Sequence, residues 1–276
     1  ARIDPPRRKE SVKTQIVKAL RVGVNVVAYA TGRELLRTKL GEEEKHNREN
    51  KDFNIARGLL EVAKLRHTGA WDSAPQALRN LMDALNEMNG PMASTDVKSI
   101  PATDPSIFNY AVVYMHGKNR FQLTRPEIEQ LRNYLDQGGV LIADACCGSK
   151  AFDTSFRDMV EQIYPEQKLE QIHGDDEMFT PEVGFDIRKV RRRVFEADQP
   201  GRPLVTTVRE GEPQIEGVKV DERYSILYSR YDISCALEQQ GSLACSGYVP
   251  EDATRIAVNL MRYALLQELS IVDARK

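Results

Sequence analysis

Two adjacent cysteines follow a stretch of sequence with the pattern of a buried strand. Residues 140–145 (Val-Leu-Ile-Ala-Asp-Ala) lack polar alternation, and Cys146 and Cys147 come directly after them. A helix is predicted next, with Asp153 as its cap. A helix N-terminus lowers the pKa of a nearby thiol and so activates it. Cys146 and Cys147 are therefore candidate nucleophiles.

A cysteine nucleophile needs a base within reach, and His116 and His173 are the candidates. Each follows a predicted strand, and the carboxyl ends of parallel strands meet at one edge of a sheet. The sequence around the thiols is an incomplete nucleophile frame: Cys146 lacks a small residue two positions before it, and Cys147 lacks a glycine two positions after it. An inert role for both as buried structural cysteines stays open.

The same strand ends carry further residues of types that bind metal ions. They mix imidazole, thiolate and carboxylate groups, which suits zinc or iron: His116, Asp144, Cys146 or Cys147, Asp153, His173 and Asp175. None of the spacings is diagnostic, and hydrogen bonds within loops explain such residues equally well. We therefore expect no native metal site and no cofactor.

Two pairs of residues have alternative roles. Asp144 and Asp232 each end or follow a predicted strand and could form an acid–base pair, or they could cap loops. Asp153 and Asp232 are also weak candidates for ligand binding. Cys235 and Cys245 flank a glycine-bearing turn, and they could pair in a disulfide in an exported protein or remain buried thiols.

The elements that position these residues alternate along the chain. Strands are predicted at 59–67, 95–100, 110–115, 140–145, 169–172 and 224–233, and helices at 73–88, 124–137, 153–163 and 251–269. For 59–67 the spacing of the apolar residues also leaves a helix open. The helix at 124–137 opens with a capping box and ends at a glycine pair. Residues 185–222 predict an inserted loop or a small antiparallel region. The series favours an open, mostly parallel, flavodoxin-like sheet with helices on both faces.

Composition excludes several classes of function. The chain has 276 residues, 41% of them apolar, and a net charge of −2, which gives no global attraction to nucleic acid or anionic membranes. No apolar run approaches the ~20 residues of a membrane span. No signal peptide is visible, although an export signal upstream stays open, so compartment and oligomeric state are not predicted. The basic run 188–193 favours a solvated or salt-bridged surface over nucleic-acid binding.

The first 52 residues differ from the rest of the chain. They predict an N-terminal helix at 12–36 and a charged linker, and the α/β domain is expected at 53–276. Residues 19–35 are identical to residues 253–269 at eight of 17 positions. Either both segments are amphipathic helices with similar packing requirements, or the first segment is the closing helix of an upstream copy of the domain.

Several motifs together resemble a bacterial family designated domain of unknown function 4159. They lie at 110–117, 131–139, 144–148, 152–157, 228–232 and 259–264, within a resemblance that covers about 53–269. The resemblance implies an architecture similar to class I glutamine amidotransferases, and it implies no particular activity. One departure is His173-Gly174, where relatives tend to have His-Pro.

Two functional hypotheses follow from these observations. The favoured one is a noncatalytic α/β binding or assembly module of a larger protein, with a protein partner or other domains of the same polypeptide. The sequence contains no P-loop, GxGxxG, GxSxG, HExxH or EF-hand motif that would argue against this hypothesis. The alternative is a cysteine-dependent hydrolase or amidotransferase-like enzyme that uses Cys146 or Cys147 with His116 or His173.

Overall fold

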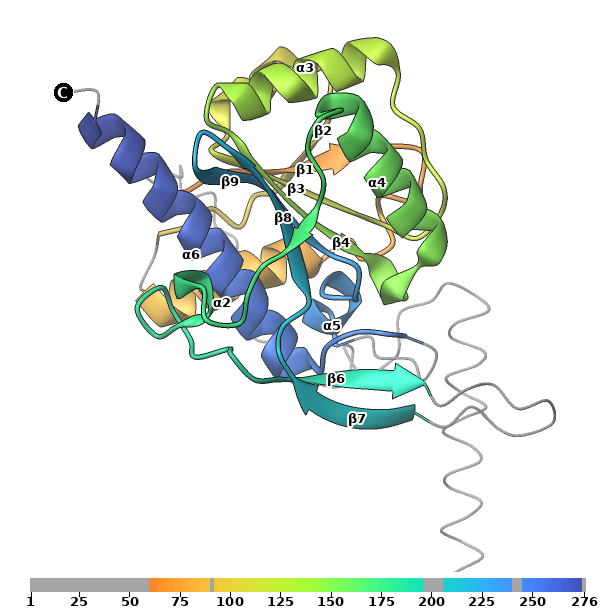
Figure 1. Cartoon of the computed structure of the whole chain (residues 1–276), viewed down its shortest axis with the longest axis vertical. Helices are drawn as coiled ribbons and strands as arrows, with labels where there is room; N and C mark the ends of the chain where they lie inside the picture. Colours follow the sequence, from red (N-terminus) through yellow and green to blue (C-terminus); the bar gives the residue numbers. More distant parts are fainter. Residues whose placement is uncertain (1–59, 90–91, 196–205, 240–244, 275–276) are drawn as a thin grey trace, which may run out of the picture. The chain divides into compact units, whose positions relative to one another are not determined.

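The main sheet of the protein has seven strands. The computed structural model describes residues 60–89, 92–195, 206–239 and 245–274, all within the compact unit Ile55–Lys276. The strands run in the order β2-β1-β3-β4-β9-β8-β5 (Figure 1). Their bounds are β1 Val62–Arg66, β2 Lys98–Pro101, β3 Val112–Gly117, β4 Val140–Ala145, β5 Glu170–Gln171, β8 Ile215–Val220 and β9 Arg223–Ser229.

Five neighbouring strands of this sheet are parallel. Their order, β2-β1-β3-β4-β9, is the order of doubly wound flavodoxin-like sheets. β8 pairs antiparallel with β9, and β5 pairs antiparallel with β8, so β5 points in the same direction as the parallel strands. The predicted open, mostly parallel sheet is confirmed, although β5 is shorter than the strand predicted at 169–172.

Helices cover both faces of the sheet, as predicted. α2 (Ala77–Asn89), the short α5 (Ser234–Leu237) and α6 (Pro250–Ala274) pack on one face, and α3 (Arg125–Asp136) and α4 (Lys150–Ile163) pack on the other (Figure 1). Because side chains alternate along a strand, Tyr114 of β3 faces α2 and α6, whereas Val113 and Met115 face α3 and α4. Both faces of the central strands are therefore buried.

The helix starts show which capping predictions hold. Thr124 and Glu127 form the predicted capping box at α3, where the Thr124 N–H donates to Glu127 Oε2 at 2.7 Å. The predicted cap of α4 is wrong, because α4 begins at Lys150 and Ser149 is its N-cap. Asp153 therefore lies within the first turn, where its carboxylate pairs with Arg157 at 3.1 Å.

The region after β5 contains the predicted antiparallel structure. β6 (Val190–Phe195) and β7 (Thr206–Gly211) form a separate two-stranded antiparallel sheet, and β8 joins the main sheet. The basic run 188–193 is salt-bridged, with Arg188 paired to Asp186 and Arg191 paired to both Glu251 and Asp252.

Some predictions fall on parts of the chain that the structure does not describe. The N-terminal helix at 12–36, the charged linker and the boundary at residue 53 all lie outside the described residues. Among the described residues, no helix combines the length and apolarity needed to cross a membrane.

Asn259 ties the loop 178–185 to α6 and provides a test of this packing. Its fully buried side chain accepts the Phe185 N–H at 2.8 Å and donates to the carbonyls of Met178 and Phe185. We expect Asn259→Ala to lower the free energy of unfolding by about 2–4 kcal/mol, because one buried and two partly buried backbone groups lose their partner. Urea denaturation measures this change. The matched control Asn133→Ala, on the exposed face of α3, should change stability by less than about 0.5 kcal/mol.

Candidate functional site

The four cysteines of the chain converge at the carboxyl ends of β4 and β9. Cys146 is bonded to Cys235, and Cys147 is bonded to Cys245, with Cα–Cα distances of 6.3 and 4.2 Å. Cys235 and Cys245 therefore neither pair with each other nor remain free thiols, which were the two alternatives that the sequence left open. The physical reason is that each of these two cysteines lies opposite a different member of the adjacent pair 146–147.

The two adjacent cysteines lie in a turn with a left-handed residue. Cys147 has φ 55° and ψ 21°, a conformation that non-glycine residues seldom adopt. Its carbonyl accepts the Ser246 N–H at 3.2 Å. Gly148 follows with φ 66°, and a Cβ there would lie 2.7 Å from the Ser246 carbonyl oxygen. The turn between β4 and α4 is thus held closely against residues 245–248.

Asp232 connects the two turns through its carboxylate. The side chain is fully buried, and its Oδ1 accepts the N–H groups of Cys147 at 2.8 Å and Cys235 at 3.2 Å. Its Oδ2 accepts the Ala236 N–H at 3.1 Å. Burial raises the pKa of Asp232, and the nearby Asp144 raises it further.

Asp144 makes the reciprocal connection from β4. It is also fully buried, and its Oδ2 accepts the N–H groups of Ile233 and Ser234, each at 3.0 Å, and the Ser234 hydroxyl at 2.9 Å. Its Oδ1 accepts the Tyr114 hydroxyl at 2.6 Å. Burial raises the pKa of Asp144 and, with Asp144 beside it, that of the Tyr114 hydroxyl. Both aspartates make loop-capping bonds, which is one of the two roles that the sequence left open.

A buried lysine lies on the same face of the sheet. Lys64 in β1 is 3% exposed, and its Nζ contacts Asp72 Oδ1 and the Ala74 carbonyl, each at 3.2 Å. The Trp71 ring lies 5.2 Å from the same Nζ. Burial lowers the pKa of Lys64, and the hydrogen bond to Asp72 opposes this shift.

Two histidines meet at the ends of β1 and β3. His116 is fully buried, and its Nε2 accepts the Ala74 N–H at 3.3 Å, so its Nδ1 carries the hydrogen and has no partner among the described residues. His67 accepts the Gly69 N–H at Nδ1 and therefore donates from Nε2 to the His116 carbonyl at 2.9 Å. Burial lowers the pKa of His116 well below its usual value and that of His67 to about 4.

The structure brings only some of the predicted site residues together. Within the described residues, those close enough to share one metal ion are Cys146, Cys147, Cys235 and Asp232, whose ligand atoms all lie within 4.8 Å of one another. His116, Asp144, Asp153, His173 and Asp175 do not belong to this group. His173 follows β5 on the same edge of the sheet, but β9 and β8 separate β5 from β4, and its side chain is exposed.

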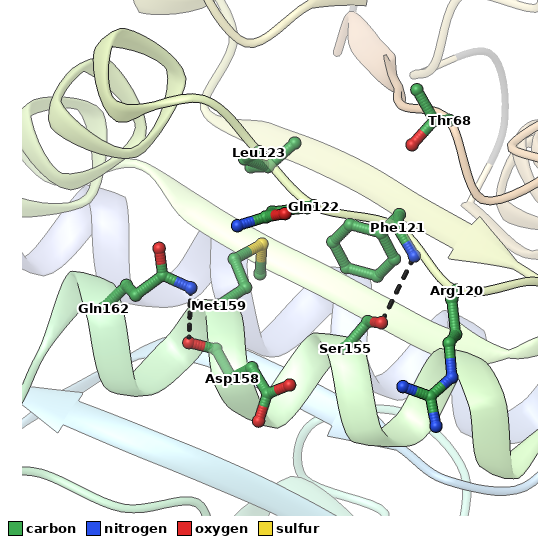
Figure 2. A pocket seen from close by; sticks show the side chains of 9 residues that line it. All are labelled: Thr68, Arg120, Phe121, Gln122, Leu123, Ser155, Asp158, Met159 and Gln162. Carbon is green, nitrogen blue, oxygen red and sulfur yellow. Dashed lines mark hydrogen bonds between the residues drawn. The ribbon is translucent and has the colours of Figure 1, made fainter.

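A separate hollow lies beside α4, on the other face of the sheet. It has a volume of about 450 Å³ and is lined by Thr68, Arg120, Phe121, Gln122, Leu123, Ser155, Asp158, Met159 and Gln162 (Figure 2). Two of its lining residues are joined by a hydrogen bond, in which the Phe121 N–H donates to Ser155 Oγ at 3.2 Å (Figure 2). None of the predicted site residues lines this hollow.

Several residues of the site were missed in the sequence. Lys64 interrupts the apolar run 62–65, and a charged residue in a strand that is buried on both faces is a detectable signal. Tyr114 and Ser234, which both bond to Asp144, carry no comparable signal, because their partner lies far away in the sequence.

A family model described as Domain of unknown function (DUF4159) matches residues 61–265. No curated protein gives a significant match.

The disulfide connectivity can be checked by peptide mapping. We expect non-reducing digestion of the oxidised protein to link the peptide that contains residues 146–147 to both Cys235 and Cys245. In Cys235→Ser, only Cys146 should become free to alkylation, because Cys147 keeps its partner. A peptide linking Cys235 directly to Cys245 in the wild-type protein would contradict the structure.

The buried His67 predicts a pH dependence of stability. Its folded pKa of about 4 lies below the usual 6.5, so the unfolded chain takes up a proton first as the pH falls. The stabilisation is fully present above pH ~6.5 and is lost progressively toward pH ~4, by on the order of 3 kcal/mol. His67→Gln should reduce this loss in urea titrations at several pH values. His173→Gln, at an exposed position, should leave it unchanged.

Proposed function

The chain belongs to the DUF4159 family, and from that premise we propose that its α/β domain is a noncatalytic binding or assembly module. The proposal extends to its setting: a larger bacterial protein in which the partner is another protein or another domain of the same polypeptide. The order of the parallel strands supports a flavodoxin-like architecture. We further propose a likeness to glutamine amidotransferases on the motifs quoted above.

The observation that carries the proposal is that the reactive groups at the carboxyl edge bond to one another. All four thiols are paired. Asp144 and Asp232 accept backbone N–H groups from the segment 232–236 and from Cys147. Neither His116 nor His173 forms a hydrogen bond to a sulfur among the described residues. A thiol nucleophile requires a base at hydrogen-bond distance, so this arrangement favours a structural role.

The usual ligand-binding position of doubly wound folds is filled by side chains in this protein, which also supports a noncatalytic role. The strand order reverses between β1 and β3, and the crevice of such a fold lies beyond the carboxyl ends of those strands. Here the protein's own side chains occupy the ends of β1 and β3, where Lys64 bonds to Asp72 and His67 bonds to the His116 carbonyl. We infer that binding to partners uses other surfaces.

One feature favours the alternative of a cysteine-dependent hydrolase or amidotransferase-like enzyme. Cys147 lies between β4 and α4 with a positive φ of 55°, and a sharp turn between a strand and a helix is where such enzymes place their nucleophile. Backbone conformations of this kind cluster at functional sites. In this hypothesis, reduction frees Cys146 or Cys147, and His116 or His173 acts as the base.

Thiol reactivity separates the two functions. The full chain is reduced with a phosphine and treated with a chloromethyl ketone analogue of glutamine, and the modified cysteines are identified by mass spectrometry. For a noncatalytic module we expect Cys146 and Cys147 to react no faster than the same residues in the urea-unfolded chain, because no base activates them. Rates of alkylation at neutral pH give the comparison.

A matched pair of variants sharpens this experiment. If one cysteine reacts more than about tenfold faster than in the unfolded chain, and His116→Gln or His173→Gln removes the excess, the enzyme hypothesis replaces the noncatalytic one. His67→Gln is the control, because His67 bonds to the backbone of His116 and Gly69.

A further inference from the structure

We propose that the chain, when its disulfides are reduced, binds one zinc ion through Cys146, Cys147, Cys235 and Asp232. These residues come from two turns, the one after β4 and the one after β9, and their ligand atoms all lie within 4.8 Å of one another. The site was not expected from the sequence, because the distance of about ninety residues between the two turns matches no zinc-binding spacing.

The separation of the sulfurs suits tetrahedral zinc. Zn–S bonds of about 2.3 Å at tetrahedral angles place two sulfurs about 3.8 Å apart. Cys147 Sγ and Cys235 Sγ, which belong to different disulfides, are already 3.8 Å apart. Cys146 Sγ is bonded to Cys235, so reduction needs to move it only from bonding distance to this same spacing.

The fourth ligand is held in place before any ion arrives. Three backbone N–H groups, from Cys147, Cys235 and Ala236, fix the carboxylate of Asp232. Its Oδ2 accepts only the Ala236 N–H among the described residues, and a carboxylate oxygen has two lone pairs, so this oxygen can also bind a cation. Outer hydrogen bonds of this kind orient metal ligands in known sites.

The chemistry of the ligand set points to zinc in a structural role. Thiolates favour zinc over magnesium or calcium, and three thiolates with one carboxylate complete a four-coordinate shell. Cys146, Cys235 and Asp232 are at most 7% exposed and Cys147 is half-buried. Because the four side chains fill a tetrahedral shell, no position is left for substrate.

Zinc can replace the disulfides only after the disulfides have been reduced. Reduction of both disulfides by a cellular thiol consumes four electrons and four protons and yields four cysteine thiols. Binding of Zn²⁺ then releases the protons of Cys146, Cys147 and Cys235 to solvent. Cys245, the former partner of Cys147, remains as a free thiol. In an oxidising compartment the disulfides form instead, and the same turns stay connected.

Zinc titration of the full, reduced chain tests the proposal. The chain is reduced with a phosphine without oxygen, and bound zinc is counted by native mass spectrometry. We expect one equivalent per chain, and Co²⁺ in its place should give a thiolate-to-metal charge-transfer band. Cys146→Ser and Cys235→Ser should lower zinc affinity at least about a hundredfold, because even the loss of an outer-shell partner costs up to that much. A folded, reduced wild-type chain that binds no zinc overturns the proposal.

Two controls identify the fourth ligand. Cys245→Ser should keep one equivalent of zinc, and loss of zinc in that variant would overturn the assignment of Asp232. Asp232→Asn should weaken binding, whereas Asp175→Asn, at an exposed aspartate outside this group, should not. Circular dichroism establishes that each variant is folded. In the wild-type chain, zinc should slow alkylation of Cys146, Cys147 and Cys235 but not of Cys245, a readout that needs no variant.

Discussion

Two buried aspartates clamp the neighbouring strands β4 and β9 to each other at their carboxyl ends. Asp144 belongs to β4 and accepts N–H groups from residues 233 and 234, which follow β9. Asp232 follows β9 and accepts the N–H of Cys147, which follows β4. A buried carboxylate is costly without partners, and charge-assisted bonds to backbone N–H groups offset that cost. The positions of three of the four sulfurs depend on this reciprocal clamp, because Cys146 and Cys147 belong to one clamped turn and Cys235 belongs to the other.

The clamp is part of a polar layer on one face of an otherwise apolar sheet. Lys64, His116, Asp144 and Ser229 lie toward the carboxyl ends of β1, β3, β4 and β9, and all are buried. Burial favours the neutral form of each titratable member, which explains the raised pKa of the aspartates and the lowered pKa of Lys64 and His116. Such a layer fixes the geometry of the edge, because a buried polar group that loses its hydrogen-bond partner destabilises the fold.

Local signals in the sequence were sufficient for much of this architecture. The strand at 140–145, the capping box at Thr124 and the placement of Cys146 between a strand and a helix all follow from neighbouring residues. The start of α4 was misjudged because Ser149 and Asp153 are both good caps, and only the fold selects between them. The cysteine pairing could not be predicted, because four cysteines allow three connectivities and the sequence does not choose among them. Long-range contacts such as Tyr114 to Asp144 have no local signal.

The clamp also explains why one set of sulfur positions suits two different cross-links. Disulfides and a zinc ion both require thiols from separate segments to meet, and the hydrogen bonds of Asp144 and Asp232 bring those segments together without the sulfurs. A covalent or metal cross-link then adds to a geometry that the backbone already has, so a change of compartment need not change the fold. A catalytic thiol needs the opposite arrangement, in which the sulfur is free to reach a substrate and a base. The same hydrogen bonds that define this edge therefore favour its use as a fastening between strands rather than as a reaction centre.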